Sequence, residues 1–450
     1  MNRRNFTDYD DDEVFEAIYG EEVRQSSGIE LIPSENYVSV EVLEAMGSVC
    51  TNKYSEGYPG KRYYGGNGNI DIIENLAIER AKQLFHADHA NVQPHSGANA
   101  NEAVYFAWCN PGDTILAMSL PAGGHLTHGS PVTRSAKIYN FVGYGVTEEG
   151  DINYNEMEEL ALKHQPKIIL VGYSAFMKIP DFDRVKRIAD KVKNLTGQHV
   201  LLMADMAHVA GLIAGGVHPN PLEHGFHVMT STTHKTLRGP RGGLILSMGK
   251  VTSPLKKTPH DIRNIPTLID RAVFPGTQGG PLEHVIAAKA VCFHEALKPE
   301  FKKYATKVVE NAKYMADVLK AKGFKLQGGG TENHLILIDL TNETEMNGKE
   351  FEAELDSIGL TLNANALPND KGGAFVPQGV RLGTPALTTR GMGKDEIDTI
   401  VQAMQFLAVS FQMMKRGEMS VDAYHDGKQN LAREINAMAH KFPIPSLEVK

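Results

Sequence analysis

The sequence has little cysteine and no long apolar run. Its 450 residues include only three cysteines, Cys50, Cys109 and Cys292, which are odd in number and widely spaced. They fit neither a disulfide framework nor a zinc site, so we expect buried free thiols in a reducing compartment. No segment approaches the roughly 20 apolar residues that span a bilayer, and the first 12 residues lack an apolar signal core. These absences predict a cytoplasmic protein with no membrane association.

An excess of positive charge is also absent. The chain has 46 Lys and Arg against 54 Asp and Glu, a formal net charge of -8. Such a balance does not attract nucleic acid, so we expect no nucleic-acid partner. Basic residues do cluster between Lys235 and Arg241, which suits a small anion. The length and the 42% hydrophobic content are those of a globular chain too large for one compact core.

Apolar runs alternate with helical patterns in the first half of the chain. The helical pattern is clear over 72–84, and the expected strands are 113–120, 167–172, 200–204, 227–230 and 243–247. This alternation predicts an α/β unit with a mostly parallel sheet and a site at the carboxyl ends of its strands. A helical segment over 281–322 leads to a second unit, with strands over 335–340 and 380–382 and a helix over 394–414.

These patterns predict three parts of the chain. We expect an N-terminal arm over 1–30, a large α/β domain over 31–300 and a small α+β domain over 301–450. The arm has an amphipathic pattern at Val14, Phe15, Ile18 and Tyr19, with no obvious local partner. This pattern predicts that the arm packs on a second subunit.

A lysine follows three hydroxyl residues at the end of an expected strand. The segment 231–243 continues through His234 and Lys235 into a Gly/Pro turn with two arginines. Desolvation lowers the pKa of a lysine, and the neutral amine attacks carbonyls such as the aldehyde of pyridoxal phosphate. A lone lysine in a basic turn is more often a surface residue, so this interpretation depends on the other motifs.

An aspartate ends the expected strand that precedes this lysine segment. The run 200–204 leads into Asp205, and His208 follows three residues later. A carboxylate there can pair with a protonated pyridine nitrogen, and His208 can hydrogen-bond ring substituents. A strand-end Asp more often caps a turn, but one crossover separates Asp205 from Lys235. This arrangement favours a pyridoxal phosphate site.

Four other motifs carry groups suited to binding or proton transfer. The turn at Ser96 opens a helix with small residues that let N–H groups approach an anion, although most such turns only cap helices. A tyrosine-dense loop over 52–66 contains a single carboxylate, Glu56, and a Gly-Gly pair precedes His125. Arg381 offers a guanidinium fork for a carboxylate.

Together these motifs resemble the serine hydroxymethyltransferase (glycine hydroxymethyltransferase) family, in the family order, over roughly residues 10–410. The resemblance implies the pyridoxal phosphate-dependent transferase fold type I, which is aspartate-aminotransferase-like. It implies reversible transfer of the hydroxymethyl group of L-serine to tetrahydrofolate, giving glycine and 5,10-methylenetetrahydrofolate. It also implies a homodimer, with a tetramer left open.

The resemblance assigns roles to individual positions. The catalytic positions are Lys235, Glu56, His234, Asp205 and Tyr64. The cofactor positions are Lys235, Asp205, His208, His125, Ser96, Gly97, Ala98, Ser174, Thr232, Gly279 and Gly280. The amino-acid substrate positions are Ser34, Tyr54, Tyr64, His208 and Arg381. The folate positions are Glu56, Tyr63, Leu120, Gly124, His125, Leu126, Asn365, Gly373, Ala374 and Phe375.

Departures from the family pattern and three alternatives stay open. Ala98 stands where the family usually has a second hydroxyl, and Pro33, Ala122 and Phe176 also depart from the family pattern.

A folate-independent aldolase for threonine-type β-hydroxy amino acids would use the same lysine, aspartate and arginine. An α-methylserine hydroxymethyltransferase is similar, but its lysine typically does not follow a histidine. An inactive pyridoxal phosphate- or RNA-binding regulator would lack the catalytic lysine or glutamate, and both are present.

Overall fold

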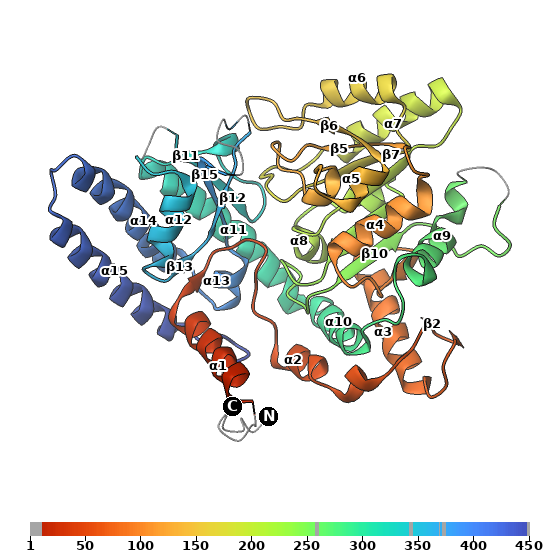
Figure 1. The fold of residues 1–450 in the computed structure, drawn as a ribbon, viewed down its shortest axis with the longest axis horizontal. Helices are drawn as coiled ribbons and strands as arrows, with labels where there is room; N and C mark the ends of the chain where they lie inside the picture. Colours follow the sequence, from red (N-terminus) through yellow and green to blue (C-terminus); the bar gives the residue numbers. More distant parts are fainter. Residues whose placement is uncertain (1–10, 257–260, 342–344, 369, 371–374, 448–450) are drawn as a thin grey trace.

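The protein is seen here as a computed structural model that describes residues 11–256, 261–341, 345–368, 370 and 375–447. Two sheets with their helices lie side by side, the larger unit on the right of Figure 1 and the smaller on the left. The larger sheet has seven strands in the order β4-β10-β9-β8-β7-β5-β6. Their bounds are β4 (His89–Asn91), β5 (Thr114–Met118), β6 (Asn140–Tyr144), β7 (Ile168–Gly172), β8 (Leu201–Asp205), β9 (Val228–Thr232) and β10 (Gly243–Ser247).

The large sheet is mostly parallel, as expected. The five strands β9, β8, β7, β5 and β6 run parallel to one another, and β10 is antiparallel to both β9 and β4. The central strands are buried along their whole length. Continuous apolar runs are typical of a sheet that helices cover on both faces.

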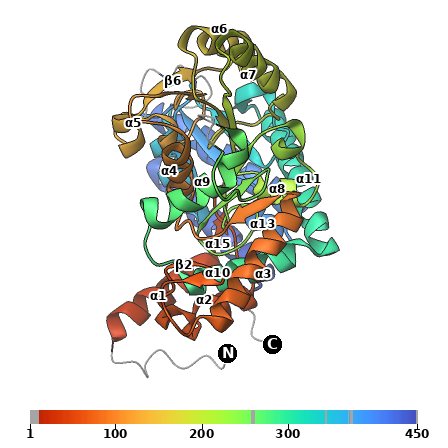
Figure 2. The same ribbon diagram turned by 90° about the vertical axis from the view of Figure 1, so that its right-hand side faces the viewer.

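Helices pack on both faces of this sheet. One face contacts α3 (Gly68–Phe85), α6 (Tyr154–His164), α7 (Phe182–Thr196), α8 (Ala210–Ala214) and α10 (Glu283–Ala296). The other face contacts α4 (Gly97–Trp108) and α9 (Ile265–Arg271), and α5 (Arg134–Ile138) lies beside β6. In Figure 2, α6 and α7 lie at the opposite end of the molecule from α2 (Val40–Met46).

The helix α7 illustrates how the local sequence defines an element. Asp181 accepts a hydrogen bond from the backbone of Arg184 and so caps the first turn. Gly197 ends the helix with a φ of 71°, in the left-handed region that glycine adopts easily. The buried side chains recur at helical spacing, at Phe182, Val185, Ile188, Ala189 and Val192.

The smaller sheet is antiparallel, with the order β11-β12-β15-β14. Its strands are β11 (Lys325–Leu326), β12 (Leu335–Asp339), β14 (Asn363–Asn365) and β15 (Gly379–Gly383). Its helices are α11 (Pro299–Ala321), α12 (Gly348–Asp356), α13 (Pro385–Thr389), α14 (Lys394–Lys415) and α15 (Val421–Lys441). Two short pairs complete the sheets, β1 (Ile29–Glu30) with β13 (Leu360–Thr361), and β2 (Gly57–Tyr58) with β3 (Lys61–Arg62).

The helical segment expected over 281–322 is two helices, α10 and α11, because Pro299 begins a new one. Proline has no N–H to continue a preceding helix but fits the first turn. The start of α11 packs in the core of the large sheet and its end in the core of the small sheet. The boundary expected at residue 301 therefore falls inside a helix that both units share, and it stays a prediction.

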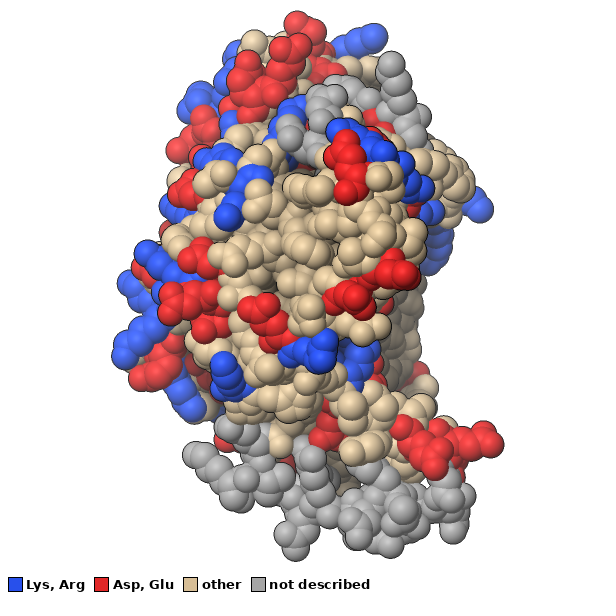
Figure 3. Space-filling view, turned by 90° about the vertical axis from the view of Figure 1, so that its left-hand side faces the viewer, with Lys and Arg blue, Asp and Glu red and all other residues tan. Residues whose placement is uncertain are grey.

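The surface charge, the cysteines and the helices give three further observations. On the side that carries α14 and α15, acidic and basic side chains are intermixed around an uncharged central area (Figure 3). Of the three cysteines, Cys109 and Cys292 are buried as expected. Cys50 is only half-buried, so the expectation of a buried thiol was wrong at that position. No helix in the part of the chain that the structure describes is long and apolar enough to cross a bilayer.

The arm helix α1 (Asp12–Ser27) packs beside α15. Its apolar side chains Val14, Ile18 and Val23 keep 52%, 48% and 46% of their surface exposed. A second subunit that covers them therefore stays a prediction. The junction of the arm with the small unit is held by Arg390, whose guanidinium donates to carbonyls of both segments.

We expect Arg390→Met to lower the free energy of unfolding by about 2–4 kcal/mol, because buried carbonyls lose a charged donor. Arg390 is 5% exposed and donates to Gly28 O, Ala439 O and Phe442 O, each at 2.6 Å. Urea unfolding measures the change. Arg433→Met, on the exposed face of α15, should stay within about 0.5 kcal/mol of the parent. A similar result for both variants would contradict the role of Arg390.

Candidate functional site

The proposed lysine and aspartate lie at one edge of the large sheet. The parallel strands β8 and β9 pair with Asp205 opposite Thr230, so both strands end at this edge. The loop that follows β9 is closed by the Thr233 N–H, which donates to Gly242 O at 3.1 Å. This loop, residues 233–242, carries Lys235 and is called the lysine loop below. The edge is the one at which the sequence predicts a site.

Lys235 lies in a partly buried position with charged groups around it. Desolvation lowers its pKa to about 8, against the opposing attraction of Asp205, and the cations Arg381 and Arg241 lower it further. The neutral amine is therefore accessible near physiological pH. Such an amine attacks carbonyl carbons.

Asp205, whose Oδ1 accepts a hydrogen bond from the Ala207 N–H at 3.2 Å, is a buried carboxylate with three donors. Its Oδ2 accepts hydrogen bonds from Asn101 Nδ2 at 2.8 Å and from His128 Nε2 at 3.0 Å. The backbone N–H of His125 donates to His128 Nδ1, so the ring proton of His128 is on the Nε2 that faces Asp205. Burial alone would raise the pKa of Asp205, but these partners hold it well below its ordinary value. The carboxylate stays ionised, as a partner for a protonated pyridine must.

Two glycines bring the chain around to His125. Gly123 has a φ of 109°, and a Cβ there would lie 2.4 Å from Ala175 O. A Cβ on Gly124 would lie 2.2 Å from Met118 O. No side chain fits at either position, so the turn needs both glycines. Burial lowers the pKa of His125 to about 4, and a neutral imidazole suits stacking on a flat ring.

The turn at Ser96 has the form of an anion site. Ser96 caps α4, with its Oγ accepting from the Asn99 N–H at 3.2 Å. A Cβ on Gly97 would lie 2.7 Å from Thr232 Cγ2, so a side chain there would fill the space beside this threonine. Ala98 follows and is partly buried. A helix N-terminus flanked by two hydroxyls and left open by a glycine fits a phosphate group.

The small unit contributes a guanidinium to the same junction. Arg381 on β15 donates from Nε to Asn363 Oδ1 at 3.1 Å and from Nη1 to Ser174 O of the large unit at 2.5 Å. Desolvation lowers the pKa of Arg381 to about 10, which leaves it charged at neutral pH. Its charge acts on Lys235, so the two cations belong to one cluster.

Ser34 and His208 lie at this junction too. The loop of Ser34 is tied to β15, since the Gly383 N–H donates to Leu31 O, and to the lysine loop through Asn36 Nδ2 on Lys235 O. His208 stacks on His334 of the small unit, with ring centroids 5.6 Å apart. Burial holds the pKa of His208 well below its ordinary value.

The residue before the lysine, His234, is also neutral. Burial lowers its pKa to about 3, and the cations Arg241, Lys235 and Lys289 act in the same direction. Its Nδ1 lies 3.4 Å from the Gly242 N–H, which donates to it across the lysine loop.

A cavity of about 440 Å³ opens beside this cluster. Its walls include five positions expected for folate: Leu120, Gly124, His125, Leu126 and Asn365. Ser174 and the apolar residues Ala364, Ala366, Leu367 and Pro377 complete much of the lining. Both units contribute to it, and its size and apolar walls with a few polar groups are typical of a small-molecule site.

The tyrosine loop forms a second, exposed cluster. Tyr54 donates to Glu56 Oε1 at 3.2 Å and contacts Tyr64 edge to face. The same loop faces the turn at Gly279 and Gly280. A Cβ on Gly280 would lie 3.3 Å from the Tyr54 ring, and one on Gly279 would lie 3.5 Å from Glu56 Oε1. Glu56 is not among the charges that act on Lys235. Tyr54, Glu56 and Tyr64 thus lie together at the surface of the chain.

Of the other expected folate positions, two have different surroundings and two cannot be placed. Tyr63 belongs to the tyrosine loop, contacts Phe274 and is 76% exposed. Phe375 is 86% exposed and does not line the cavity. Gly373 and Ala374 lie outside the described residues.

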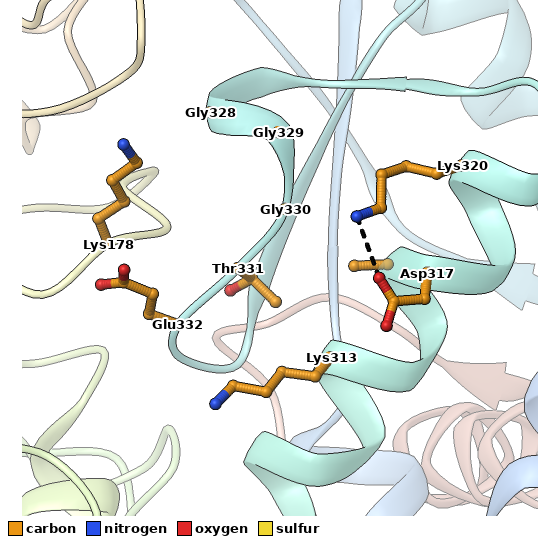
Figure 4. A pocket seen from close by; sticks show the side chains of 10 residues that line it. Lys178, Lys313, Asp317, Lys320, Gly328, Gly329, Gly330, Thr331 and Glu332 are labelled. Atoms are coloured by element: carbon orange, nitrogen blue, oxygen red, sulfur yellow. Dashed lines mark ion pairs between the residues drawn. The ribbon is translucent and has the colours of Figure 1, made fainter.

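Another hollow, at the junction of α11 with the turn 328–331, is lined by both lysines and carboxylates. Figure 4 shows that its lysines point in different directions, and Lys320 pairs with Asp317 at 3.0 Å. Lys178 pairs with Asp151 at 2.8 Å. Two of the three lysines that line the hollow are therefore already paired with carboxylates, so the cluster around Lys235 is the better candidate site.

Sequence reasoning missed four residues of the site. Asn101 and His128 lie inside motifs that were considered for other residues, and a helical turn brings each to Asp205. His334 and Asn363 belong to the second sheet, and their sequence surroundings give no sign that they meet the large unit.

One comparison bears on this arrangement. A protein-family model described as serine hydroxymethyltransferase matches residues 7–404 of the chain. The match spans the arm, both sheets and the first half of α14. It therefore includes the lysine loop, the cavity and the strand that carries Arg381.

We expect the rate at which Lys235 bonds to an aldehyde ligand to rise with pH up to about 8 and then level off, because only the neutral amine reacts. The rate is followed by absorbance on adding pyridoxal phosphate to the cofactor-free chain. Borohydride reduction and peptide mapping identify the lysine. Lys289 is the sharpest rival, since burial lowers its pKa to about 7. A label on Lys289, or a midpoint near the ordinary lysine value, would contradict the assignment.

Proposed function

The chain belongs to the serine hydroxymethyltransferase family, and we propose that it transfers the hydroxymethyl carbon of L-serine to tetrahydrofolate, giving glycine and 5,10-methylenetetrahydrofolate. The family is one of pyridoxal phosphate-dependent transferases of fold type I, so the chain is an enzyme of that type. The observation that carries the folate part is the cavity lined by His125 and Ser174, whose walls include five of the expected folate positions.

The residues of the site fit pyridoxal phosphate. When bound, the cofactor supplies a ring that accepts electrons from the substrate carbon. Lys235 would hold the aldehyde of the cofactor, and Asp205 would accept a hydrogen bond from the protonated ring nitrogen. The turn of Ser96 and Gly97, with the Thr232 hydroxyl, would hold the phosphate. His125 would cover the ring face.

Arg381 would orient the amino-acid substrate through its carboxylate. A guanidinium can bind both carboxylate oxygens, and Asn363 and the Ser174 carbonyl already fix the direction of its fork. Ser34 and His208 lie at the same junction and would contact the rest of the amino acid. Since His208 is held neutral, it can donate or accept a hydrogen bond there without adding charge.

We also propose that Glu56 and Tyr64 act in the site of a second copy of the chain. Glu56 would move the proton between the serine hydroxyl and folate. Two observations support this exchange: the tyrosine loop is exposed, and the charge of Glu56 does not act on Lys235. The exposed apolar face of α1 is a further surface that a homodimer would cover.

Folate dependence separates this proposal from the aldolase alternative. Leu126→Asp places a charge in an apolar wall, which should cost about 2 kcal/mol of folate binding, or roughly thirtyfold in affinity. We expect serine-to-tetrahydrofolate transfer to fall accordingly, while folate-independent cleavage of threonine stays within about threefold. Leu195→Asp, on the exposed surface of α7, is the matched control and should change neither rate. Equal release of glycine from serine with and without tetrahydrofolate in the parent enzyme would favour the aldolase.

Mixed dimers test the shared site. Lys235→Ala and Glu56→Gln should each be inactive in transfer alone. After unfolding and reassembly together, about a quarter of the sites should contain neither change, so about a quarter of the activity should return. A mixture of Lys235→Ala with Asp205→Asn should stay inactive, because both residues belong to one chain's cluster. No recovery in the first mixture would mean that Glu56 serves its own chain.

A further inference from the structure

A fully buried lysine outside the lysine loop has no role in the function proposed above. Lys289 on α10 is 1% exposed. Its ammonium donates to Val92 O at 2.7 Å, to Pro94 O at 3.1 Å and to Gly243 O at 2.7 Å. An ammonium has three donors, and all three are used on backbone carbonyls. Within the described residues, no carboxylate forms an ion pair with it.

The three carbonyls belong to the two segments that form the cofactor site. Val92 and Pro94 directly precede the anion-binding turn at Ser96, and Gly243 directly follows the lysine loop. The same segments are joined by the Gly243 N–H, which donates to Pro94 O at 2.9 Å. Lys289 therefore fastens the turn and the loop to each other from behind.

Close packing beside Lys289 leaves no room for a side chain at two glycines of the adjoining backbone. A Cβ on Gly242 would lie 2.5 Å from Lys289 Cε, and a Cβ on Gly243 would lie 2.2 Å from Ser96 O. The two glycines let the lysine loop lie directly against both the lysine and the turn. Lys289 thus packs directly against the backbone of Gly242, and Gly243 next to it packs directly against the Ser96 turn.

The ammonium is costly where it stands. Removing a charge from water without a counter-charge is unfavourable, and burial lowers the pKa of Lys289 to about 7, with Glu74 the only opposing influence. A phosphate group at the Ser96 turn would bring negative charge to the other side of the same backbone. In a medium of low dielectric, that attraction acts across several ångströms.

We propose that Lys289 is a positioning residue for the cofactor phosphate: it holds the Ser96 turn against the lysine loop and supplies a buried positive charge behind the phosphate. It does not contact the cofactor. The inference rests on the proposed function, which assigns the phosphate to this turn. It predicts that Lys289 strengthens binding of ligands that carry a phosphate and not of the pyridine ring itself.

The test compares two ligands on the full-length, cofactor-free chain. Dissociation constants of pyridoxal phosphate and of pyridoxal, which lacks the phosphate, are measured for the parent and for Lys289→Met. We expect the variant to bind pyridoxal phosphate at least about tenfold more weakly, and pyridoxal within about threefold of the parent. Equal losses for both ligands, or no loss for either, would overturn the proposal.

A matched control and a second variant guard against a merely structural effect. Arg80 Nη1 donates to Ala290 O of the same helix at 2.7 Å, so Arg80→Met also removes a cation from a backbone carbonyl of α10. It should leave the preference for the phosphate-bearing ligand unchanged. Lys289→Arg keeps the charge and should keep the preference within about threefold, even if stability falls. Should Lys289→Met fail to fold, loss of the preference in Lys289→Arg would overturn the proposal.

The parent separates this inference from the proposed function. A parent chain that binds both ligands equally would refute the phosphate site itself. A parent that prefers the phosphate, with a preference that Lys289→Met retains, would refute only the role of Lys289.

Discussion

The carboxylate of Asp205 is buried at the end of β8, and two donors from other segments keep it charged there. Asn101 on α4 and His128 after β5 both reach its Oδ2, and Thr230 on β9 donates to Asn101 Oδ1 and so sets the direction of the amide. An uncompensated buried charge would be unfavourable, so these segments are stable together only in this arrangement. Because the strand ends must meet for the network to form, the carboxylate organises the edge of the sheet at which the lysine loop lies.

The parts of this site that are readable from sequence are those with local patterns. Buried strands such as β8 and β10 are short apolar runs with polar ends, and their expected bounds agree with the structure to within a residue. The break at Pro299 was missed because the apolar periodicity continues across it, although the proline itself marks a helix start. The motif at Lys235 combines a strand end with hydroxyls and glycines, so it can be identified even when the strand bounds are off by a residue.

Contacts between distant segments could not be read in the same way. His334 lies 126 residues beyond His208, and only the packing of the two sheets brings the rings together. Lys289 has the sequence surroundings of an ordinary helical lysine, and its three carbonyl partners become apparent only in three dimensions. The second subunit proposed to complete the site at the tyrosine loop is still harder to predict from sequence. The loop's own residues lie together, whereas in the proposed dimer the surface that would complete it belongs to a second copy of the chain.

Burial is the main reason why three imidazoles at the junction are neutral, and the balance of charge adds to it. Desolvation lowers the pKa values of His125, His208 and His234 below the ordinary one, and nearby cations among Lys235, Arg381 and Arg241 act in the same direction. A protonated imidazole there would add to an existing positive field. Since the rings carry no charge, the positive potential of the site is left for anions that enter it. A substrate carboxylate and a phosphate are two such anions, and they would bind at different places in the site, one at Arg381 and the other at the Ser96 turn. The preference for anionic ligands thus follows from burial of the histidines as much as from the cations themselves.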